Sequence, residues 1–589
     1  MSKLNKDTLL NYYKGNADYS AGDTSYSPFY SNIGLEIHDN APGITKLWLH
    51  YNRFSRVLWN VFAEFGGVID KKASSPEKLV FTNGNKLSFF GTDAFMLFAD
   101  DGQDVRLFTE KSDALTESWV QEATENTVLL RGYSANGDAR DPDEAVPFLL
   151  GIRAVNGKLT VTDNGITAAP ENGKLLLAFV FEALTPEESS VKQKLLSAPK
   201  TVEACAHASL NVIKNTVKEL DITCPPGQAA AAARAINGLT ENLAKAPGAL
   251  SKHLSSYPSR GYSSHFLWDT CFQNLAYEEI NTELAEDFLL QFKENQRPDG
   301  KYPQFLCSTW ARPGYTQPAL LGWATERVYR KTGNIVFLKT MLPSLDKNNS
   351  WWLNNRMTAS GVIRCAHGLE TGQDDSPRFD NGATLACDMN AYLLSQLRLT
   401  AALHEELGEA NEAAHWSKKA NALSDAMLRV LYCAEDNLFY DVTPNGTSFI
   451  KIVSPVSLLP LWAGVSLPEA EARSMIERYL LSPDYLFGDI PFPSVAYNEP
   501  TYDAAHWWRG PTWMSEAWLM LETLQKFGYQ KEYAEAADRL FRMLLADGGM
   551  HELFNSRTGE GMGYEQQGWT CATYLALLKQ RSEIFAKQM

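Results

Sequence analysis

Residues 224–227, Cys224-Pro225-Pro226-Gly227, separate two stretches of the chain that differ in hydrophobic period. A double proline removes two backbone N–H donors and interrupts regular structure, which is typical of a boundary. Before it the apolar residues fall in short runs, and after it they recur at helical spacing to the C-terminus. We therefore expect an N-terminal β-sandwich domain over residues 1–190, a linker over 191–227 and a helical domain over 228–589.

The N-terminal part has the pattern of antiparallel strands. Alternating or apolar runs are found at Ile44–Tyr51, Val57–Phe65, Lys78–Phe90, Thr127–Tyr133, Val146–Val155 and Lys174–Phe181. Asn-Gly pairs lie between or within these runs, at 83–84, 156–157, 164–165 and 172–173. Because Asn-Gly supplies the positive φ values of tight hairpin turns, the four pairs predict an antiparallel β-sandwich.

The C-terminal part is predicted to be a mostly α domain. Twelve helices are expected near 228–247, 265–279, 282–296, 316–332, 335–356, 382–406, 410–432, 451–463, 467–481, 508–527, 529–546 and 564–586. This number fits six consecutive αα-hairpins, which close into an (α/α)6 barrel around one pocket. Long links within a compact domain are usually functional, and such links lie at 248–264, 297–315, 357–381, 482–507 and 547–563.

Composition narrows the range of functions. A net charge of −16 over 589 residues argues against nucleic acid as a partner, which needs a basic surface. No run approaches the ~20 apolar residues of a membrane span, and the N-terminus shows no apolar signal segment. The eight cysteines form no Cys-x-x-Cys pair. We therefore expect a cytoplasmic protein with no cofactor, no catalytic metal and no membrane contact; a structural calcium ion and the oligomeric state stay open.

The stretch Cys365–Asp380, CAHGLETGQDDSPRFD, places three carboxylates close together: Glu370, Asp374 and Asp375. Carboxylates repel one another, and their crowding commonly raises the pKa of one so that it serves as a proton donor at neutral pH. A solvated acidic loop, or a cap for the helix that follows, would explain the same residues. The local sequence does not decide between these explanations.

Two clusters precede the acidic stretch. Residues 257–269 run from a loop into a helix that carries Trp268 and Asp269. The aspartate could accept hydrogen bonds from two sugar hydroxyls while the tryptophan packs on the sugar ring, or it could complement the helix dipole. After residues 297–304, a helix begins with polar Gln317 ahead of an apolar run, and turn chemistry does not require that glutamine.

Two further clusters follow the acidic stretch. Residues 506–513, HWWRGPTW, surround Arg509 with three tryptophans, as in a ligand wall or a packed aromatic core. Residues 550–569 hold a second acidic group, Glu552, Glu560 and Glu565, in a glycine-rich loop. Hydrolysis of a glycosidic bond needs two carboxyl groups. One is protonated and donates to the leaving oxygen, and one is ionised and activates water or attacks the anomeric carbon.

Five motifs taken together resemble glycoside hydrolase family 63. They are FLWD at 266–269, ETGQDDSPRF at 370–379, DMNAYL at 388–393, WWRGPTW at 507–513 and HELFNSRTGEG…GWT at 551–570. The family comprises inverting α-glycosidases such as processing α-glucosidase I, with bacterial glucosidases and mannosylglycerate or glucosylglycerate hydrolases. Trehalases of family 37 share a similar pattern more distantly. The resemblance covers roughly 250–575 and implies an (α/α)6 barrel, which several members precede with a β-sandwich.

The resemblance also implies a reaction and a set of roles. It makes Asp374 the general acid and Glu552 the general base of an exo-acting, inverting hydrolase. This enzyme would remove a terminal α-linked sugar, glucose first of all, from a disaccharide or small glycoside. The expected substrate-binding residues are Trp268, Asp269, Gln317, Arg378, Trp508, Arg509 and Glu565.

Departures from the family pattern leave two assignments open. The family more often has an aromatic or apolar residue at the position of Gln373, and Asn or Phe at that of Asp375. Asp375 is therefore a rival to Asp374 on chemical grounds. Glu560 and Glu565 are local rivals to Glu552.

Two other functional classes fit parts of the pattern. Sugar epimerases and isomerases also use (α/α)6 barrels, with paired histidines as acid and base; His265, His367, His506 and His551 lie near the motifs. A carbohydrate-binding protein without activity would need no pair of opposed carboxylates. Hydrolysis, interconversion or binding alone of small α-glycosides distinguishes the three.

Overall fold

The computed structural model describes residues 2–9, 25–26, 33–37, 44–49, 56–63 and, with breaks, 70–588. The breaks are 71–72, 76, 101, 103, 112–114, 135–145, 164, 184, 226, 246–252, 260, 263, 307–313, 381 and 383–384. The chain divides into two compact units. The first is formed mainly by residues 1–265, and the second by Phe266–Glu278, Thr282–Leu306 and Ala311–Met589. No helix among the described residues has the length and apolar character needed to cross a membrane.

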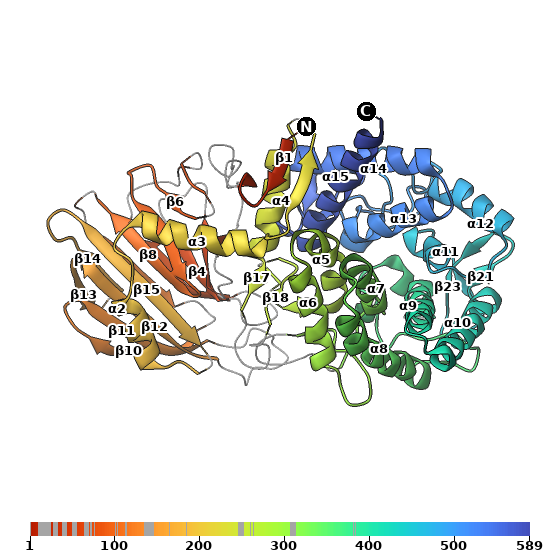
Figure 1. Cartoon of the computed structure of the whole chain (residues 1–589), viewed down its shortest axis with the longest axis horizontal. Helices are drawn as coiled ribbons and strands as arrows, with labels where there is room; N and C mark the ends of the chain where they lie inside the picture. Colours follow the sequence, from red (N-terminus) through yellow and green to blue (C-terminus); the bar gives the residue numbers. More distant parts are fainter. Residues whose placement is uncertain are drawn as a thin grey trace. The chain divides into compact units, whose positions relative to one another are not determined.

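The first unit contains two seven-stranded sheets in which the neighbouring strands that the structure describes are antiparallel (Figure 1). One has the order β10 (Leu115–Ala123), β11 (Thr127–Ser134), β12 (Val146–Asn156), β15 (Leu175–Ala183), β8 (Ala94–Ala99), β7 (Lys86–Gly91), β6 (Leu79–Val80). The other has the order β13 (Lys158–Thr162), β14 (Gly165–Ala169), β9 (Val105–Lys111), β5 (Arg56–Ala63), β4 (Ile44–Leu49), β3 (Ile33–Ile37), β2 (Ser25–Tyr26). Phe95 and Phe148 of the first sheet share one hydrophobic core with Leu107 and Ile166 of the second. The predicted antiparallel sheet domain is confirmed.

The Asn-Gly pairs turn the chain in two ways. Asn83-Gly84 lies between β6 and β7, which pair with each other, and Gly84 has a φ of +89°. Strands β13 and β14, on either side of residues 164–165, also pair; Asn164 itself lies outside the described residues. Asn156-Gly157 and Asn172-Gly173 instead lead from one sheet to the other. The expected within-sheet hairpins are thus found at two of the four pairs, because a turn reverses the chain locally without choosing the sheet that the next strand joins.

Two helices cover the outer face of the first sheet. They are α2 (Glu188–Leu196) and α3 (Val202–Thr216), whose apolar side chains share a core with residues of β8, β11, β12 and β15. Helix α2 packs closely on Gly151 of β12. A Cβ added at Gly151 would lie 2.5 Å from Val191 and 2.7 Å from Leu195. Much of the segment predicted as a linker is therefore helical and packed on the sandwich.

The predicted break at residues 224–227 separates a strand from a helix. Strand β16 (Asp221–Cys224) pairs with β1 (Ser2–Asn5), and α4 (Ala229–Glu241) begins shortly after Gly227, which has a φ of +79°. The first unit continues with β17 (Leu243–Ala244) and β18 (Ser255–Ser256), and β19 (His265–Phe266) lies at its border.

The second unit is helical. Its α-helices among the described residues are α5 (Leu267–Ile280), α6 (Thr282–Glu294), α7 (Leu321–Thr332), α8 (Ile335–Asn355), α9 (Cys387–Glu406), α10 (Ala410–Val430), α11 (Leu459–Trp462), α12 (Glu469–Met475), α13 (Met514–Lys526), α14 (Gln530–Asp547) and α15 (Gly568–Gln588). Together with α4, these helices place one α-helix in each of the twelve predicted segments. The segment at 451–463 is the weakest, because α11 is only four residues long and follows a 3-10 turn.

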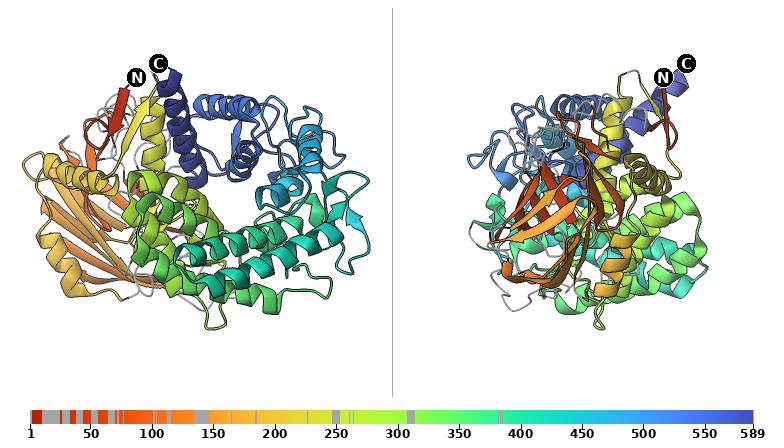
Figure 2. Two further views of the ribbon diagram at one scale, coloured as in Figure 1. Left: turned by 45° about the vertical axis from the view of Figure 1, so that its right-hand side comes forward. Right: turned by 90° about the vertical axis from the view of Figure 1, so that its left-hand side faces the viewer.

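Figure 2 shows the helices of this unit from two further sides, and consecutive helices differ in burial. Helices α7, α9, α11, α13 and α15 each pack against the next, and α8, α10 and α14 pack on them. Helix α9 is buried throughout Cys387–Leu397 and α13 throughout Met514–Leu521, whereas α14 buries a single stripe. A helix that is apolar on one face lies on the outside of such an assembly, and one buried all round lies inside it.

His404 joins three helices of the second unit through two carboxylates. It lies in the last turn of α9; its Nε2 is 2.9 Å from Asp346 Oδ1 of α8, and its Nδ1 is 2.6 Å from Glu409 Oε2, immediately before α10. Burial lowers the pKa of His404, but the hydrogen bonds to Asp346 and Glu409 outweigh it, so the net pKa is raised. The two carboxylates therefore favour the protonated form of His404 in the folded chain.

We predict that His404→Gln lowers the free energy of unfolding by about 1–2 kcal/mol at acidic to neutral pH, since hydrogen bonds to charged groups are lost. A raised pKa contributes stability that is complete below about pH 6.5, the ordinary value, and is lost as pH rises through the folded-state pKa. Urea unfolding at about pH 6 and about pH 9 should thus show a smaller difference at the higher pH. His415→Gln, an exposed histidine of α10, is the control; an effect of His404→Gln that grows with pH would contradict the prediction.

Candidate active site

Four tryptophans gather where loops of the second unit enter α5, α13 and α15. Trp268 and Trp569 are the second residues of α5 and α15, and Trp513 immediately precedes α13. Trp508, in the 3-10 turn η6 (Trp507–Arg509), stacks on Trp513 with ring centroids 3.7 Å apart. The Trp268 ring lies 5.9 Å from that of Trp508 and 5.8 Å from that of Trp569. This tryptophan cluster joins three of the predicted motifs.

The acidic loop, residues 365–380, lies directly against this cluster. Gly372 has a φ of +79°, and a Cβ at this position would lie 2.4 Å from the Trp268 indole. Glu370 is fully buried, and its carboxylate accepts hydrogen bonds from Arg356 Nη2 at 2.7 Å and from the Ala366 N–H at 2.8 Å. Glu370 therefore anchors the start of the loop.

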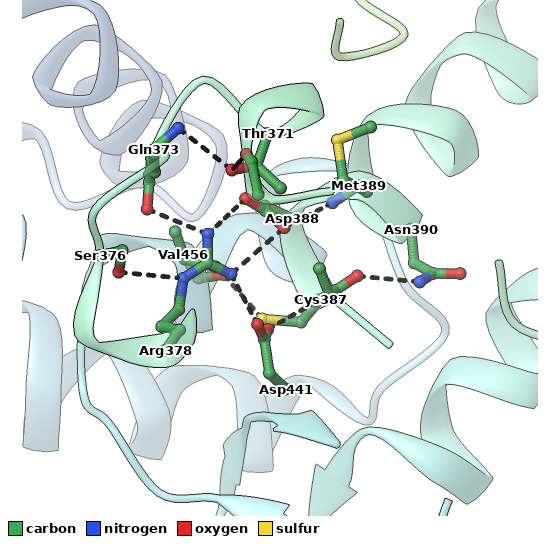
Figure 3. A network of polar contacts seen from close by, with 12 residues as sticks. Thr371, Gln373, Ser376, Arg378, Cys387, Asp388, Met389, Asn390, Asp441 and Val456 are labelled. Carbon is green, nitrogen blue, oxygen red and sulfur yellow. Dashed lines mark hydrogen bonds and ion pairs between the residues drawn. The ribbon is translucent and has the colours of Figure 1, made fainter. Parts of the chain in front are cut away.

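Arg378 anchors the end of the loop (Figure 3). It lies in the 3-10 turn η3 (Pro377–Phe379) and is 3% exposed. Its guanidinium donates to Asp388 Oδ2 at 2.8 Å, to Asp441 Oδ2 at 2.9 Å and to Gln373 Oε1 at 3.0 Å. Contacts of 3.4 Å reach Asp388 Oδ1 and Ser376 Oγ. A guanidinium has five N–H donors, and the five contacts above engage its Nε and both of its Nη groups. The network therefore favours a role in holding the loop over the predicted contact with substrate.

The outer side of the loop is tied to residues 506–509. Asp375 Oδ1 accepts a hydrogen bond from the Trp508 backbone N–H at 3.0 Å, and Asp375 Oδ2 lies 3.3 Å from His506 Nε2. Burial raises the pKa of the half-buried Asp375, against the influence of Trp508, His506 and Arg509. Arg509, predicted to bind the sugar, forms a two-point ion pair with Asp380, in which Nη1 is 3.1 Å from Oδ2.

Glu552 lies at the base of a hairpin formed by β25 (Leu553–Phe554) and β26 (Gly561–Met562). Backbone hydrogen bonds of 2.8 and 3.0 Å between Thr512 and Phe554 join this hairpin to the 506–513 motif. Glu552 is 3% exposed, and its Oε2 accepts a hydrogen bond from the Tyr564 N–H at 3.3 Å. A Cβ at Gly563 would lie 2.6 Å from that oxygen, so glycine makes room for the carboxylate.

These contacts connect both acidic segments through one framework. Asp375 binds the 506–513 motif, this motif binds the Glu552 hairpin, and the Glu552 carbonyl accepts a hydrogen bond from Trp569 Nε1 at 3.0 Å. Asp374 has an exposed side chain, whereas Glu552 is buried. The framework thus carries one solvent-facing and one buried carboxyl group, and hydrolysis of a glycosidic bond needs two carboxyl groups, one to donate a proton and one to activate water.

His551 bridges two carboxylates beside Glu552. Its Nδ1 is 2.7 Å from Asp547 Oδ1, and its Nε2 is 3.6 Å from Glu565 Oε1. Burial lowers the pKa of His551, but Asp547 and Glu565 outweigh it and the net pKa is raised. Glu565, predicted to bind substrate, therefore faces a histidine whose protonated form it favours.

Asp269 lies at the start of α5, and Gln317, which precedes α7, is hydrogen-bonded to the backbone of α5 there. Asp269 is 4% exposed, and burial raises its pKa to about 8 against the opposing hydrogen bonds of its own backbone and of Trp268. Gln317 Oε1 accepts a hydrogen bond from the Trp268 backbone N–H at 3.0 Å. Gln317 thus satisfies one of the N–H groups that the first turn of a helix leaves without a helical partner.

Three non-glycine residues of the motif loops have positive φ values. They are Trp507 at +33°, Met550 at +53° and Gln566 at +52°. L-residues rarely adopt this conformation, and such strain gathers at functional sites where the surrounding structure enforces it. Each of the three lies within two residues of a predicted site residue: Trp508, Glu552 or Glu565.

Sequence reasoning missed several residues of this framework: Trp513, Trp569, Asp388, Asp441 and Glu516. The first three stand inside the motif strings that carry the family resemblance, so the signal was present. Glu516 is the charged residue of the otherwise uncharged run Met514–Leu521, a local signal for a buried polar role. Asp441 is the first residue of the short strand β23 (Asp441–Val442), and its sequence context carries no such signal. Among the described residues, no three His, Cys, Asp or Glu side chains gather so as to hold a metal ion.

A family model described as the mannosylglycerate hydrolase MGH1-like glycoside hydrolase domain matches residues 262–570, just over half of the 589 residues. The chain belongs to this family. It is a glycoside hydrolase, and the resemblance to family 63 is confirmed. The matched segment contains the acidic loop, the tryptophan cluster and the Glu552 hairpin.

Three similar proteins illustrate the relationship. Mannosylglycerate hydrolase MGH1 of Selaginella moellendorffii is 25% identical over 411 residues, which cover 54% of this chain and 81% of the relative. The crystal structure of a GH63 mannosylglycerate hydrolase from Thermus thermophilus in complex with glucose has a TM-score of 0.51 at 22% identity, covering 59% of this chain and 99% of that one. A bacterial glucoamylase complexed with acarbose has a TM-score of 0.59 at 12% identity, covering 97% and 95%. The two crystal structures show a shared fold, which in the glucoamylase extends over nearly the whole chain.

We predict that Gly372→Ala destabilises the second unit and lowers activity, because the new Cβ would overlap the Trp268 indole in addition to the backbone strain. Strain alone costs about 1–2 kcal/mol. Gly528→Ala is the matched control, since Gly528 has the same φ of +79° and open space around its Cβ position. Chemical unfolding should show a larger loss for Gly372→Ala than for Gly528→Ala, and equal losses would show that contact with Trp268 is unimportant.

Proposed function

We propose that this glycoside hydrolase is exo-acting and removes a terminal α-linked sugar from a small glycoside with inversion at the anomeric carbon. The observation that carries the proposal is the family match over residues 262–570, within which two carboxyl-bearing segments are held on one framework. Glucose is the first candidate for the terminal sugar. The relatives named above are mannosylglycerate hydrolases, so mannose and a glycerate aglycone belong among the candidates.

The proposed general acid is Asp374 and the proposed general base is Glu552. An acid must reach the leaving oxygen, and the exposed side chain of Asp374 agrees with this requirement. A base must hold one water beneath the anomeric carbon, and Glu552 is buried with its Oε2 oriented by the Tyr564 N–H. In an inverting pair the two carboxyl groups stand roughly 6.5–9.5 Å apart, which leaves room for that water.

The proposed sugar site lies at the tryptophan cluster, where polar side chains border the rings. Trp268 and Trp508, which are 3% and 2% exposed, would back this site with packed rings, and Asp269 would supply a carboxyl group at the start of α5. Buried polar groups that pair with particular hydroxyls reject epimers which leave them unpaired, so such a site selects one terminal sugar. Arg509 and Glu565, already paired with Asp380 and His551, would contribute through their remaining hydrogen-bonding capacity.

We also propose that α5–α15, with the predicted helical segment at 228–247, form the (α/α)6 barrel of a catalytic domain spanning residues 228–589. The alternation of fully buried and one-face-buried helices supports this arrangement. A barrel end built from helix N-termini and long loops suits a one-sugar pocket. The cytoplasmic location inferred from composition stays a prediction.

The histidines do not favour an epimerase. Within the described residues, His506 lies against Asp375 and His551 against Asp547 and Glu565, so each faces carboxylates. An epimerase of this architecture would need two histidines opposed across the sugar. Family membership favours hydrolysis over both this reaction and binding alone.

The proposed function is tested by proton NMR of the purified chain with a panel of α-glucosides, α-mannosides and α-galactosides that includes glycerate conjugates. We expect one small glycoside to release its terminal sugar, first as the β-anomer, because an inverting site delivers water to the face opposite the leaving group. Long α-glucans should keep their viscosity. The α-anomer as first product, or a fast loss of viscosity before monosaccharide accumulates, would contradict the proposal.

We predict that Asp374→Asn and Glu552→Gln each lower kcat by at least ~10²-fold, the lower range for a positioned acid or base. Both changes are isosteric, so thermal unfolding should stay close to that of the wild type. Glu560→Gln, an exposed residue of the same hairpin, should keep kcat within about threefold. Near-normal kcat in either main variant would transfer its role to Asp375 or to Glu565, whose amide variants belong in the same series.

A further inference from the structure

Glu516 is a buried acid that the proposed chemistry does not use. It is the third residue of α13 and is 1% exposed. Its Oε1 accepts a hydrogen bond from Gln373 Nε2, and within the described part of the chain its Oε2 has no hydrogen-bond partner. Burial raises the pKa of Glu516 to about 8, against the influence of Arg378. Since burying a carboxyl group costs free energy, specific contacts must offset that cost.

Gln373 links Glu516 to Arg378. The Gln373 amide donates to Glu516 through its nitrogen and accepts from Arg378 Nη2 through its oxygen at 3.0 Å, so both ends fix its orientation. The Gln373 backbone N–H donates to Thr371 Oγ1 at 3.1 Å, and the residue is 2% exposed. Because Asp374 is the next residue, a fixed Gln373 fixes the direction in which the loop presents Asp374.

We propose that Glu516 is a positioning residue that holds the general acid Asp374 in place through Gln373. The assignment rests on the proposed function, in which Asp374 protonates the leaving oxygen. Glu516 contacts neither substrate nor reacting atoms in this scheme. Gln373 requires a hydrogen-bond acceptor at this place, and an amide oxygen supplies one as well as a carboxyl oxygen does.

A purely structural role of Glu516 predicts a different kinetic result. An acidic residue in the first turn of a helix also complements the helix dipole, which would stabilise α13 without touching the chemistry. A displaced general acid slows the departure of leaving groups that need a proton. A loosened fold lowers the amount of active enzyme and slows all substrates alike.

The test compares kcat on the best glycoside of the panel with kcat on the fluoride of the same sugar, because fluoride departs with little need of a proton. For Glu516→Leu we expect kcat on the glycoside to fall about 10- to 100-fold, as for a misplaced catalytic group. Its kcat on the fluoride should fall less than about threefold, with KM within about threefold. Glu516→Gln keeps an acceptor for Gln373 and should rescue both activities.

Gln373→Leu tests the same contact from the loop and serves if Glu516→Leu does not fold. The double variant should be no more than about twofold slower than Gln373→Leu, because Gln373→Leu already removes the contact with Glu516 together with that to Arg378. Thr400→Val is the matched control, since it removes a buried hydroxyl bonded to Asn349 Nδ2 at 3.1 Å in the same unit. It should leave the ratio of the two kcat values unchanged.

Asp374→Asn, measured in parallel, separates this inference from the proposed function. If Asp374→Asn slows glycoside and fluoride equally, the assignment of the acid fails. If Asp374→Asn spares the fluoride while Glu516→Leu slows both substrates equally, or neither, the positioning role of Glu516 is overturned. A Glu516→Gln variant as slow as Glu516→Leu would overturn it too, since an acceptor alone would then be insufficient.

Discussion

One buried guanidinium holds the candidate site together. Arg378 joins the acidic loop to Asp388 of α9, 10 positions later, and to Asp441 of β23 (Asp441–Val442), 63 positions later. Burying such charges costs several kcal/mol per ion, at an order of magnitude, and only well-formed pairs offset it. Removing one partner would leave an unpaired charge in a dry interior, so the loop has one favourable placement. Contact with the substrate would compete with this requirement, so the binding role of Arg378 that the resemblance implies stays a prediction beside its role in holding the loop.

The tryptophan cluster imposes a second constraint, of shape. The large rigid ring of Trp268 at the start of α5 leaves no room for a side chain at Gly372, so the loop meets this ring with its backbone. Gly563 has the same role beside the Glu552 hairpin, because the absence of a Cβ there makes room for the Glu552 carboxylate. Charge pairing on one side and close packing on the other therefore determine where the two proposed catalytic groups can lie.

Much of the fold was predictable because it follows from local periodicity. Twelve apolar repeats gave twelve α-helices, and alternating runs gave antiparallel sheets. The Asn-Gly pairs show where local rules end, since Asn172-Gly173 turns tightly but delivers β15 to the other sheet. In the site, motif order identified the acidic loop and the hairpin. Glu516 was missed because its burial and its contact with Gln373, 143 positions away, are tertiary facts.

Asp374 and Asp375, which the sequence alone does not distinguish chemically, lie in different environments. Asp375 accepts the Trp508 N–H and lies against His506, so turning it toward a leaving group would detach the 506–513 motif from the loop. The Asp375 carboxyl group therefore holds the loop in place, as the Glu370 carboxylate does at the start of the loop. Asp374 projects an exposed side chain from a backbone fixed on both sides, by Gln373 and by Asp375. A proton donor needs a fixed backbone and a side chain that can reach the substrate, so this difference supports the proposal that Asp374, rather than Asp375, is the general acid.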